Sequence, residues 1–195
     1  MAFSTNFDGT ENPLSEGGVW INNGLDWTKC QKANGYAFGT QSGVGGYDDS
    51  YAYLRGFSRN VQLSAVVRIP NPNVIGTHEV ELHARWIDGP HVAQGYEISL
   101  NLSGDVQIIR WNGPFGDFTL IGTVGNYPGL KDGDVFSATA LENVITGYVN
   151  GVPLAQAIDD TFPSGNPGIG FFRRAQGNNS DFGFNSFTAE SLTGA

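Results

Sequence analysis

Apolar and polar residues alternate along most of the chain, in short runs that turn-forming residues separate. The stretch from Val144 to Phe172 shows the pattern most clearly, because the runs ITGYV and VPLAQAI flank Asn150-Gly151. Asn-Gly between two such runs predicts a β-hairpin with a type I′ turn, which needs positive φ at both central residues. The acidic pair Asp159-Asp160, a Gly/Pro-rich turn and the apolar run GIGFF follow. We therefore expect three consecutive strands in this stretch.

The same period of two predicts strands along the rest of the chain, and no segment holds a helical period over three turns. Residues 34–50 are rich in glycine and are interpreted as a loop. The expected total is about 12–14 strands with turn signals every 8–12 residues, which is typical of an all-β sandwich. We expect residues 1–195 to form one domain, since sandwiches of this length are common as single domains. Further strands are predicted over 3–7, 19–21, 51–57, 61–69, 78–87, 95–102, 106–111, 118–124, 135–141 and 181–189.

The run from His78 to Ile87 places its apolar and polar residues on opposite faces of a strand. Its apolar face carries Val80, Leu82, Ala84 and Trp86, which we expect in the core, and its polar face carries Glu79, Glu81, His83 and Arg85. The next strand adds Glu97, Ser99 and Asn101 to the polar face and Tyr96 to the core face. Three interpretations stay open for the polar face: a solvated surface with cross-strand ion pairs, a sugar-binding surface, or an acid/base site.

Aromatic residues offer a second candidate surface, because their flat faces can stack on sugar rings. Most of them are expected in the core. Trp111 differs, since it ends a predicted strand beside the turn Asn112-Gly113-Pro114, where binding residues often gather. We therefore expect Trp111 to be exposed and to contact a ligand.

The charge of the chain limits its partners. Lys and Arg total 10 against 19 Asp and Glu, which gives a formal net charge of −9. Nucleic-acid backbones and anionic membranes attract basic proteins, so neither is an expected partner. The N-terminal run MAFSTNFDGTENP lacks the basic and apolar regions of a signal peptide, and no apolar run is long enough to span a membrane. Cys30 is the only cysteine and is expected to be a buried free thiol.

Several of these runs together resemble the concanavalin A-like lectin/glucanase sandwiches, in their laminin-G-like and glycan-active branches. The resemblance rests on the opening FSTNFDGTENPLSEGGVW and on the runs GYEISL, VQIIRW, KDGDVFSATA, ITGYVNGVPLAQAID, GNPGIGFF and DFGFNSFTA. It implies an all-β fold of two antiparallel sheets in a jelly-roll sandwich, with a face that often binds carbohydrate. It also implies a calcium ion near the terminal strands, for which Asn6, Asp8 and Asp181 are the candidate ligands.

Catalytic signatures of this family are incomplete in the chain. Glycosidases of this fold carry E-x-D-x-x-E on one strand, whereas this chain has Glu79-Val80-Glu81-Leu82-His83. The strand patterns of alginate lyases are also absent. If the protein is an enzyme, a polysaccharide lyase or glycosidase, then His83, Arg85, Glu81 and Tyr96 are the expected catalytic residues.

We therefore predict a non-catalytic carbohydrate-binding module whose partner is a glycan or polysaccharide. Its expected ligand-binding residues are Glu81, His83, Arg85, Glu97, Asn101 and Trp111. Two alternatives stay open: a carbohydrate-active enzyme, and a structural, decoration or receptor-binding protein that contacts other subunits of a virion or similar assembly. An extracellular protein without its leader or a virion component would fit the absence of a signal peptide.

Overall fold

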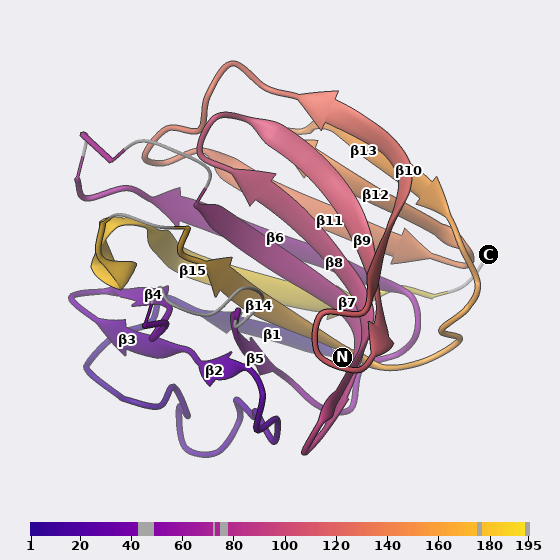
Figure 1. The fold of residues 1–195 in the computed structure, drawn as a ribbon, viewed down its shortest axis with the longest axis horizontal. Helices are drawn as coiled ribbons and strands as arrows, with labels where there is room; N and C mark the ends of the chain where they lie inside the picture. Colours follow the sequence, from indigo (N-terminus) through magenta and orange to yellow (C-terminus); the bar gives the residue numbers. More distant parts are fainter. Residues whose placement is uncertain (43–48, 72, 75–77, 175–176, 194–195) are drawn as a thin grey trace.

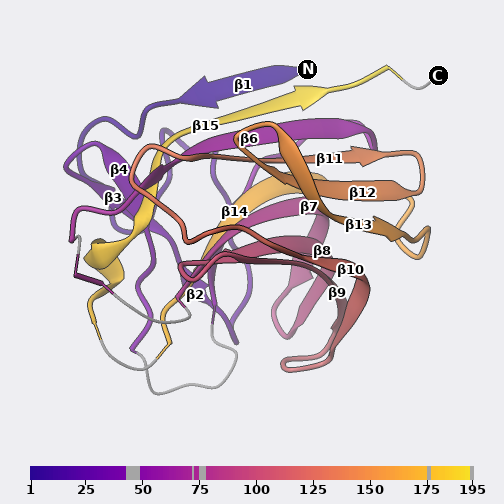
Figure 2. The same cartoon turned by 90° about the horizontal axis from the view of Figure 1, so that it is seen from above.

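The computed structural model describes residues 1–42, 49–71, 73–74, 78–174 and 177–193. These residues form two stacked, twisted sheets, and Figure 1 and Figure 2 show the two layers from directions 90° apart. The only helical element among them is the 3₁₀ turn η1, Asn179–Asp181. In the part of the chain that the structure describes, no helix is long and apolar enough to span a bilayer. The predicted all-β jelly-roll sandwich is thus confirmed.

The first sheet has eight strands in the order β13-β12-β11-β6-β15-β4-β3, and β1 pairs with β15 beside this path. Strand β15 therefore brings the two ends of the described chain together, because β1 and β15 are neighbours (Figure 2). The strands are β1 (Ala2–Thr5), β3 (Gln31–Ala33), β4 (Tyr36–Phe38), β6 (Val61–Arg68), β11 (Val135–Leu141), β12 (Val144–Val149), β13 (Val152–Ile158) and β15 (Gly183–Ser191).

The second sheet has seven strands in the order β10-β9-β8-β7-β14-β5-β2. Neighbouring strands are antiparallel, apart from the parallel pair β2–β5 at one edge. The strands are β2 (Thr28–Lys29), β5 (Ser50–Tyr53), β7 (Glu79–Gly89), β8 (Val92–Asn101), β9 (Asp105–Gly113), β10 (Phe118–Asn126) and β14 (Asn166–Phe172).

The main core lies between the sheets and consists of the inward-facing residues of both. Each sheet contributes alternate positions along its strands, as the period of two predicts. Examples from the seven-stranded sheet are Val80, Leu82 and Ile98, and examples from the eight-stranded sheet are Leu63, Phe136 and Phe187. Cys30 is a buried free thiol in this core, as expected.

The predicted hairpin at Asn150-Gly151 joins β12 to β13. Asn150 has φ of 51° and Gly151 has φ of 79°, so both central residues adopt the positive φ that a type I′ turn needs. This part of the prediction is confirmed.

Two N-terminal predictions are wrong. Residues 19–21 are not a strand, because only Ile21 forms an isolated bridge, with Tyr53. The glycine-rich segment 34–50 is not entirely a loop either, since β4 within it pairs with β3 in a short hairpin whose turn is Asn34-Gly35. Residues 43–48 of this predicted loop lie outside the described residues. Short strands of two or three residues contain too few alternating positions for a periodicity argument to detect them.

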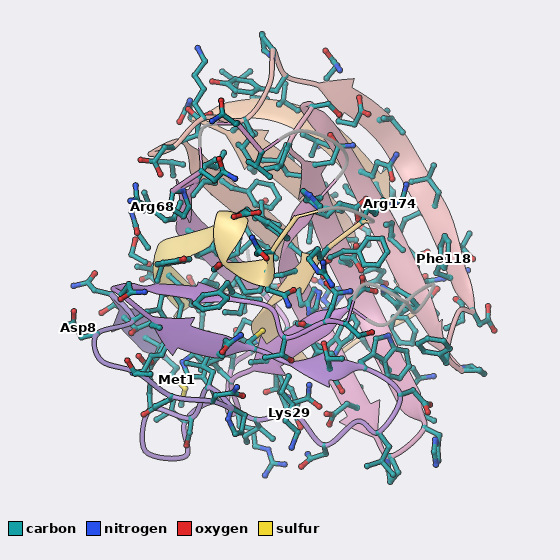
Figure 3. All side chains as sticks on the ribbon, turned by 60° about the vertical axis from the view of Figure 1, so that its left-hand side comes forward. Met1, Asp8, Lys29, Arg68, Phe118 and Arg174 are labelled. Carbon is teal, nitrogen blue, oxygen red and sulfur yellow. The ribbon has the colours of Figure 1, made fainter. Side chains whose placement is uncertain are left out.

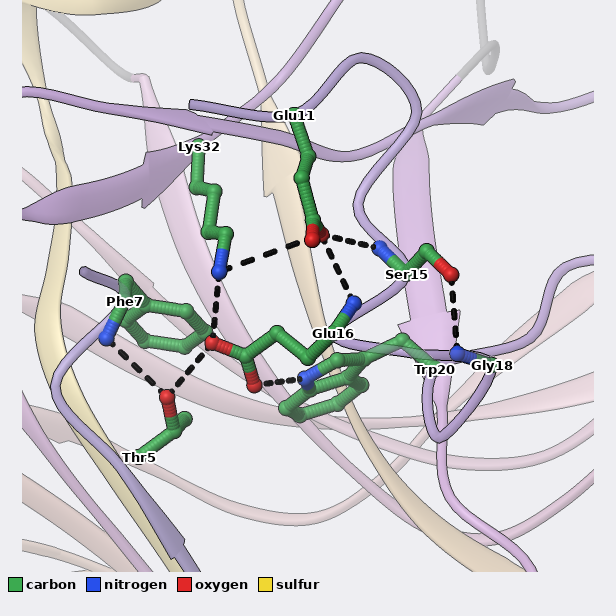
Figure 4. A network of polar contacts seen from close by, with 8 residues as sticks. All are labelled: Thr5, Phe7, Glu11, Ser15, Glu16, Gly18, Trp20 and Lys32. Atoms are coloured by element: carbon green, nitrogen blue, oxygen red, sulfur yellow. Dashed lines mark hydrogen bonds and ion pairs between the residues drawn. The ribbon is translucent and has the colours of Figure 1, made fainter. Parts of the chain in front are cut away.

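Polar contacts around Glu16 hold the irregular N-terminal segment in place (Figure 4). The carboxylate of Glu16 accepts hydrogen bonds from Thr5 Oγ1 at 2.7 Å, Trp20 Nε1 at 2.8 Å and Lys32 Nζ at 3.0 Å. Glu11 accepts from the backbone N–H groups of Ser15 and Glu16, which lowers the pKa of Glu11. These contacts anchor the segment that leads to the residues covering the seven-stranded sheet.

Candidate functional site

Three polar residues of β7, Glu79, Glu81 and His83, lie on the outer face of the seven-stranded sheet, the face turned away from the main core. Register pairing sets His83 opposite Glu97 and Glu81 opposite Ser99 on β8. Strand β9 continues these rows with Ile109 beside Glu97. The sequence-predicted grouping of Glu81, His83 and Glu97 on one face is therefore present in the structure.

This outer face is not a solvated surface at its centre. Glu81 is 0% exposed, His83 1% and Glu97 2%. A second hydrophobic cluster, aromatic except for Ala93, covers them; its members are Trp27, Tyr51, Tyr53, Trp86, Ala93 and Trp111. Trp27 reaches across the sheet, because its ring lies 6.3 Å from Tyr51 on β5 and 5.8 Å from Trp111 on β9, between ring centroids. The interpretation of this face as a solvated one is wrong for these residues.

Arg85 and Trp86 occupy the opposite faces from those expected. The β7–β8 register shifts between Ala84 and Ile87, and Arg85 has φ of 54°, so the strand is bulged there. The bulge turns Trp86 to the outer face, where its ring stacks on His83 at 4.1 Å. No surface carrying both His83 and Arg85 is formed.

Arg85 instead lies inside the sandwich, 1% exposed. Its guanidinium donates to three backbone carbonyls: Arg59 O at 3.1 Å, Phe162 O at 3.2 Å and Glu142 O. It also lies over the ring of Tyr96, 5.8 Å from the centroid. These carbonyls come from three separate connections, two of which (β5–β6 and β13–β14) pass from one sheet to the other, so Arg85 links β7 to the other sheet.

Tyr96 belongs to the same inner network, as its expected core position implies. Its hydroxyl donates to Asp159 Oδ1 at 2.6 Å, and Arg110 Nη1 donates to Asp159 Oδ2 at 2.6 Å. Burial raises the pKa of Tyr96 to about 12, and the hydrogen bond to Asp159 acts in the same direction. The four residues expected to act together in catalysis are thus divided, with Glu81 and His83 on the outer face and Arg85 and Tyr96 inside.

A cavity of about 90 Å³ opens on the outer face, mainly over β8, β9 and β10, with Glu79 of β7 and Phe172 of β14 also in its lining. Figure 3 shows two of its lining residues, Phe118 and Arg174, on the same side of the molecule. The lining combines aromatic rings with carboxyl, amide and guanidinium groups. The lining residues are Asp49, Glu79, Glu97, Gln107, Ile109, Trp111, Phe118, Phe172 and Arg174.

Hydrogen bonds fix the polar groups of the cavity. Trp111 Nε1 donates to Glu97 Oε2 at 2.6 Å, and Ser99 Oγ donates to Glu79 Oε2 at 3.1 Å. The guanidinium of Arg174 lies 5.4 Å from the centroid of the Phe172 ring, with Nε 3.9 Å from Glu79 Oε1. The cavity therefore has a carboxylate–guanidinium pair at its rim and a buried carboxyl group at its floor.

Burial dominates the protonation of these groups. It raises the pKa of Glu97 to about 8, aided by the charge of Glu79 and opposed by the hydrogen bond from Trp111. Burial also raises the pKa of Glu79 and raises that of Glu81 well above its ordinary value. For His83, burial lowers the pKa to about 3, so its imidazole is neutral at physiological pH.

Trp111 is not exposed as expected, since only 3% of it is accessible. It lines the cavity from within, because Trp27 packs edge-on against its ring. Asn101 has a local role: its Oδ1 accepts from Ser103 Oγ and from the N–H groups of Gly104 and Asp105, which closes the β8–β9 turn.

The candidate calcium ligands occupy two kinds of position. Asn6 and Asp8 are exposed in the segment after β1. Asp181 is buried and accepts from the backbone N–H of Asn178 at 2.7 Å, within the turn of η1. The calcium site stays a prediction.

Several cavity residues were not selected from the sequence. The positions of Gln107 and Phe118 could have been predicted from the two hairpins, because the strand registers set Gln107 beside Ser99 and Phe118 beside Trp111. Phe172 ends the predicted strand GIGFF and Arg174 follows it, and neither has a local signal, since their position depends on β14 pairing with β7.

No family model and no curated protein matches this chain. Solved structures do match it over almost its whole length. The carbohydrate-binding module CBM66 from Bacillus subtilis matches with a TM-score of 0.63 and 14% identity, over 91% of this chain and 96% of that one. A protein of unknown function with a galectin-like fold, also from Bacillus subtilis, gives a TM-score of 0.62 at 10% identity over 100% of both chains.

A β-glucanase from Bacillus licheniformis matches with a TM-score of 0.58 and 12% identity over 98% of both chains. Identities this low establish the fold and leave the activity open. The fold is thus one that carbohydrate-binding modules and glycoside hydrolases share. The architecture and these matches together show that the chain is a concanavalin A-like jelly-roll sandwich.

Proposed function

We propose that the protein is a carbohydrate-binding module that holds part of a glycan in the cavity over β8, β9 and β10. The observation that carries this proposal is the lining, in which aromatic rings and hydrogen-bonding groups converge on one hollow. Binding sites commonly combine an apolar lining with a few placed polar groups. Phe118 is 39% exposed at the rim and presents a ring to a sugar, while Gln107, Glu79 and Arg174 offer donors and acceptors for hydroxyl groups.

The size of the cavity limits what enters it. At about 90 Å³ it is well below the ~300 Å³ at which drug-sized ligand pockets begin. One edge or one end of a sugar unit therefore enters, and the rest of the glycan lies along β10. Phe118 and Leu120, 39% and 49% exposed, continue the surface in that direction.

Glycan-array screening that includes acidic polysaccharides, followed by calorimetry with each hit, tests the proposal. Phe118→Ala and Gln107→Ala should each weaken binding by about tenfold or more, which corresponds to about 1.4 kcal/mol. Leu141→Ala is the matched control, because Leu141 is equally exposed (39%) but lies on the eight-stranded sheet. Absence of binding to every glycan, or equal losses in the control, would refute the proposal.

Glycan cleavage is the second candidate. It is favoured by Glu79 and Glu97, two carboxyl groups with raised pKa that line the same cavity, since perturbed pairs of this kind serve acid/base chemistry. Reducing-end release and the absorbance of unsaturated products, measured on each bound glycan, distinguish the two functions. Turnover that Glu79→Gln abolishes would establish the enzyme, and binding without turnover would establish the module. If neither occurs, the predicted assembly role is tested next by sedimentation.

A further inference from the structure

A buried group of potential metal ligands lies beside the cavity but is not needed for the glycan proposal. Glu81, His83 and Glu97 each offer one ligand atom, and these atoms all lie within 4.8 Å of one another. His83 Nε2 and Glu81 Oε2 are 3.1 Å apart. All three side chains are buried, so the group differs from the exposed acidic clusters that are common on protein surfaces.

The charges of this group are not balanced by the protein. Among the described residues, Glu81 is paired only with His83 and Glu97 takes part in no ion pair, so neither carboxyl group is paired with a Lys or Arg. Burial of two carboxylates is unfavourable unless a cation or two protons neutralise them. One divalent cation supplies the charge that two protons would otherwise supply.

Unpartnered polar atoms give an independent indication of a missing species. Of the six buried side-chain atoms without a hydrogen-bond partner in the described chain, two are Glu81 Oε1 and His83 Nδ1. Two more are the indole nitrogens of Trp86, which stacks on His83, and of Trp27, which packs on Trp111. Unsatisfied buried groups are rare, so this part of the sheet lacks a polar species. An ion on the Glu81 carboxylate would satisfy Oε1, whereas the indole N–H groups only donate and require a water or another acceptor.

We propose that Glu81, His83 and Glu97 bind one divalent transition-metal ion of the zinc type. Two ligand atoms at about 2.0–2.1 Å from a tetrahedral Zn²⁺ lie ~3.3 Å from each other. His83 Nε2 and Glu81 Oε2 are 3.1 Å apart, close to that distance. The imidazole ligand disfavours Ca²⁺ and Mg²⁺, which take oxygen ligands. Three protein ligands leave a fourth position for water.

The surroundings suit such an ion. Trp111 Nε1 donates to Glu97 Oε2, which is the kind of outer contact that orients a ligating carboxylate. Glu97 also lines the cavity, so the cavity provides the entry path that a buried site needs. The ion would tie β7 to β8 beneath the aromatic cluster.

Metal binding to the full chain tests the proposal, after treatment with a chelator and removal of that chelator. Calorimetry with Zn²⁺ should show one ion per chain, and Co²⁺ should give the intense visible absorption of a tetrahedral site. Glu81→Gln and His83→Gln should each weaken binding by more than the roughly 10–100-fold that loss of an outer contact costs. Circular dichroism establishes that each variant is folded before titration.

Two control variants separate this site from surface binding. His91→Gln removes a histidine that is exposed and paired with Asp26 at 2.9 Å, and Glu190→Gln removes an exposed carboxylate on β15. Both should bind Zn²⁺ like the unaltered chain. The proposal is overturned if the unaltered chain binds no stoichiometric Zn²⁺, or if His91→Gln loses binding while folded Glu81→Gln and His83→Gln retain it. If Glu81→Gln and His83→Gln do not fold, Glu97→Gln is the deciding variant, and unchanged Zn²⁺ affinity in it likewise overturns the proposal.

Discussion

Replacement of the buried Arg85 by methionine should strongly lower the free energy of unfolding of the protein. Methionine keeps the length and apolar stem of the side chain but removes the donors to three backbone carbonyls. Arg85 is 1% exposed, so water cannot readily replace the lost bonds. The carbonyls of Arg59, Glu142 and Phe162 would then lose the partner that joins them.

The expected magnitude follows from the number and burial of these bonds. Hydrogen bonds from a charged donor contribute about 1.5–3 kcal/mol each, but their sum overstates the loss because the charge itself is costly to bury. A buried acceptor left without its donor costs about 1–3 kcal/mol, so three carbonyls, two of them in part-buried hydrogen bonds, give a total loss of about 3–5 kcal/mol. We expect that loss in the free energy of unfolding, which is a large share of the about 5–15 kcal/mol that a native domain has.

Urea denaturation followed by tryptophan fluorescence measures the effect, and Arg59→Met is the matched control. Arg59 is 41% exposed at its side chain, where it lies 3.8 Å from Glu142 Oε2 and donates an exposed hydrogen bond to Glu142 O at 3.1 Å, so its replacement should cost less than about 1 kcal/mol. Arg85→Lys should fall between, because an ammonium lacks the planar fork that reaches three carbonyls. A loss below about 1 kcal/mol for Arg85→Met, or equal losses at positions 85 and 59, would refute the inference that Arg85 joins the sheets.

Three further outcomes follow from single contacts. Gly151→Ala should lower the free energy of unfolding by about 1–2 kcal/mol in thermal denaturation from strain alone, since φ is 79° and no atom lies within 4 Å of the added Cβ. Gly170→Ala should cost about 1–3 kcal/mol by overlap with Glu81 Oε2, and a melting temperature equal to that of the unaltered chain would contradict this geometry. The pKa of Asp159 is lowered in the folded state by hydrogen bonds, including that from Arg110, despite the opposing effect of burial. Its contribution is therefore present above the unfolded pKa near 3.9 and is lost as pH falls, so Asp159→Asn should destabilise at pH 6 but much less at pH 3.

The order of strands along the chain was predictable because turn chemistry and period-two alternation act locally. Asn150-Gly151 specifies its own turn through the φ angles it permits, and the flanking runs then fix the register. Where a strand is regular, the same alternation also predicts which of its residues point to the same face of the sheet. This reasoning places Glu81, His83 and Glu97 together without any knowledge of tertiary contacts.

Alternation fails after a bulge, and β7 contains one. The residues EVELHARW alternate without a break in the sequence. The bulge, however, adds a residue at Arg85, so that the residues after it point to the opposite face of the sheet from the one that alternation predicts. The sequence feature that marks this bulge is Gly95, which lies inside β8 rather than at its start. A Cβ at Gly95 would lie 2.7 Å from Arg85 O and 2.9 Å from Trp86 Cα, so the bulge requires glycine on the neighbouring strand.

The burial of the outer face was not predictable for a different reason. Periodicity reports which residues share a face, but it does not report what lies against that face. Trp27 precedes a strand of two residues that pairs in parallel at the sheet edge, and its contact with Trp111 joins positions far apart in the sequence. Long-range contacts of this kind depend on the assembled sheet, which is why Trp111 was expected to be exposed and is not.

The bulge at Arg85 divides β7 into a part whose polar residues point outward and a residue whose side chain points inward. Before the bulge, Glu81 and His83 face outward beside the cavity. At the bulge, the guanidinium of Arg85 points inward and donates to Arg59 O and Phe162 O, in two loops that join the sheets. Substitutions on the two sides should therefore separate experimentally. Arg85→Met should reduce stability while the remaining folded protein keeps its affinity for Zn²⁺, whereas His83→Gln should reduce that affinity by more than about 100-fold. Equal loss of Zn²⁺ affinity in folded Arg85→Met would show that the inner and outer networks form one site, and would contradict the division of the strand.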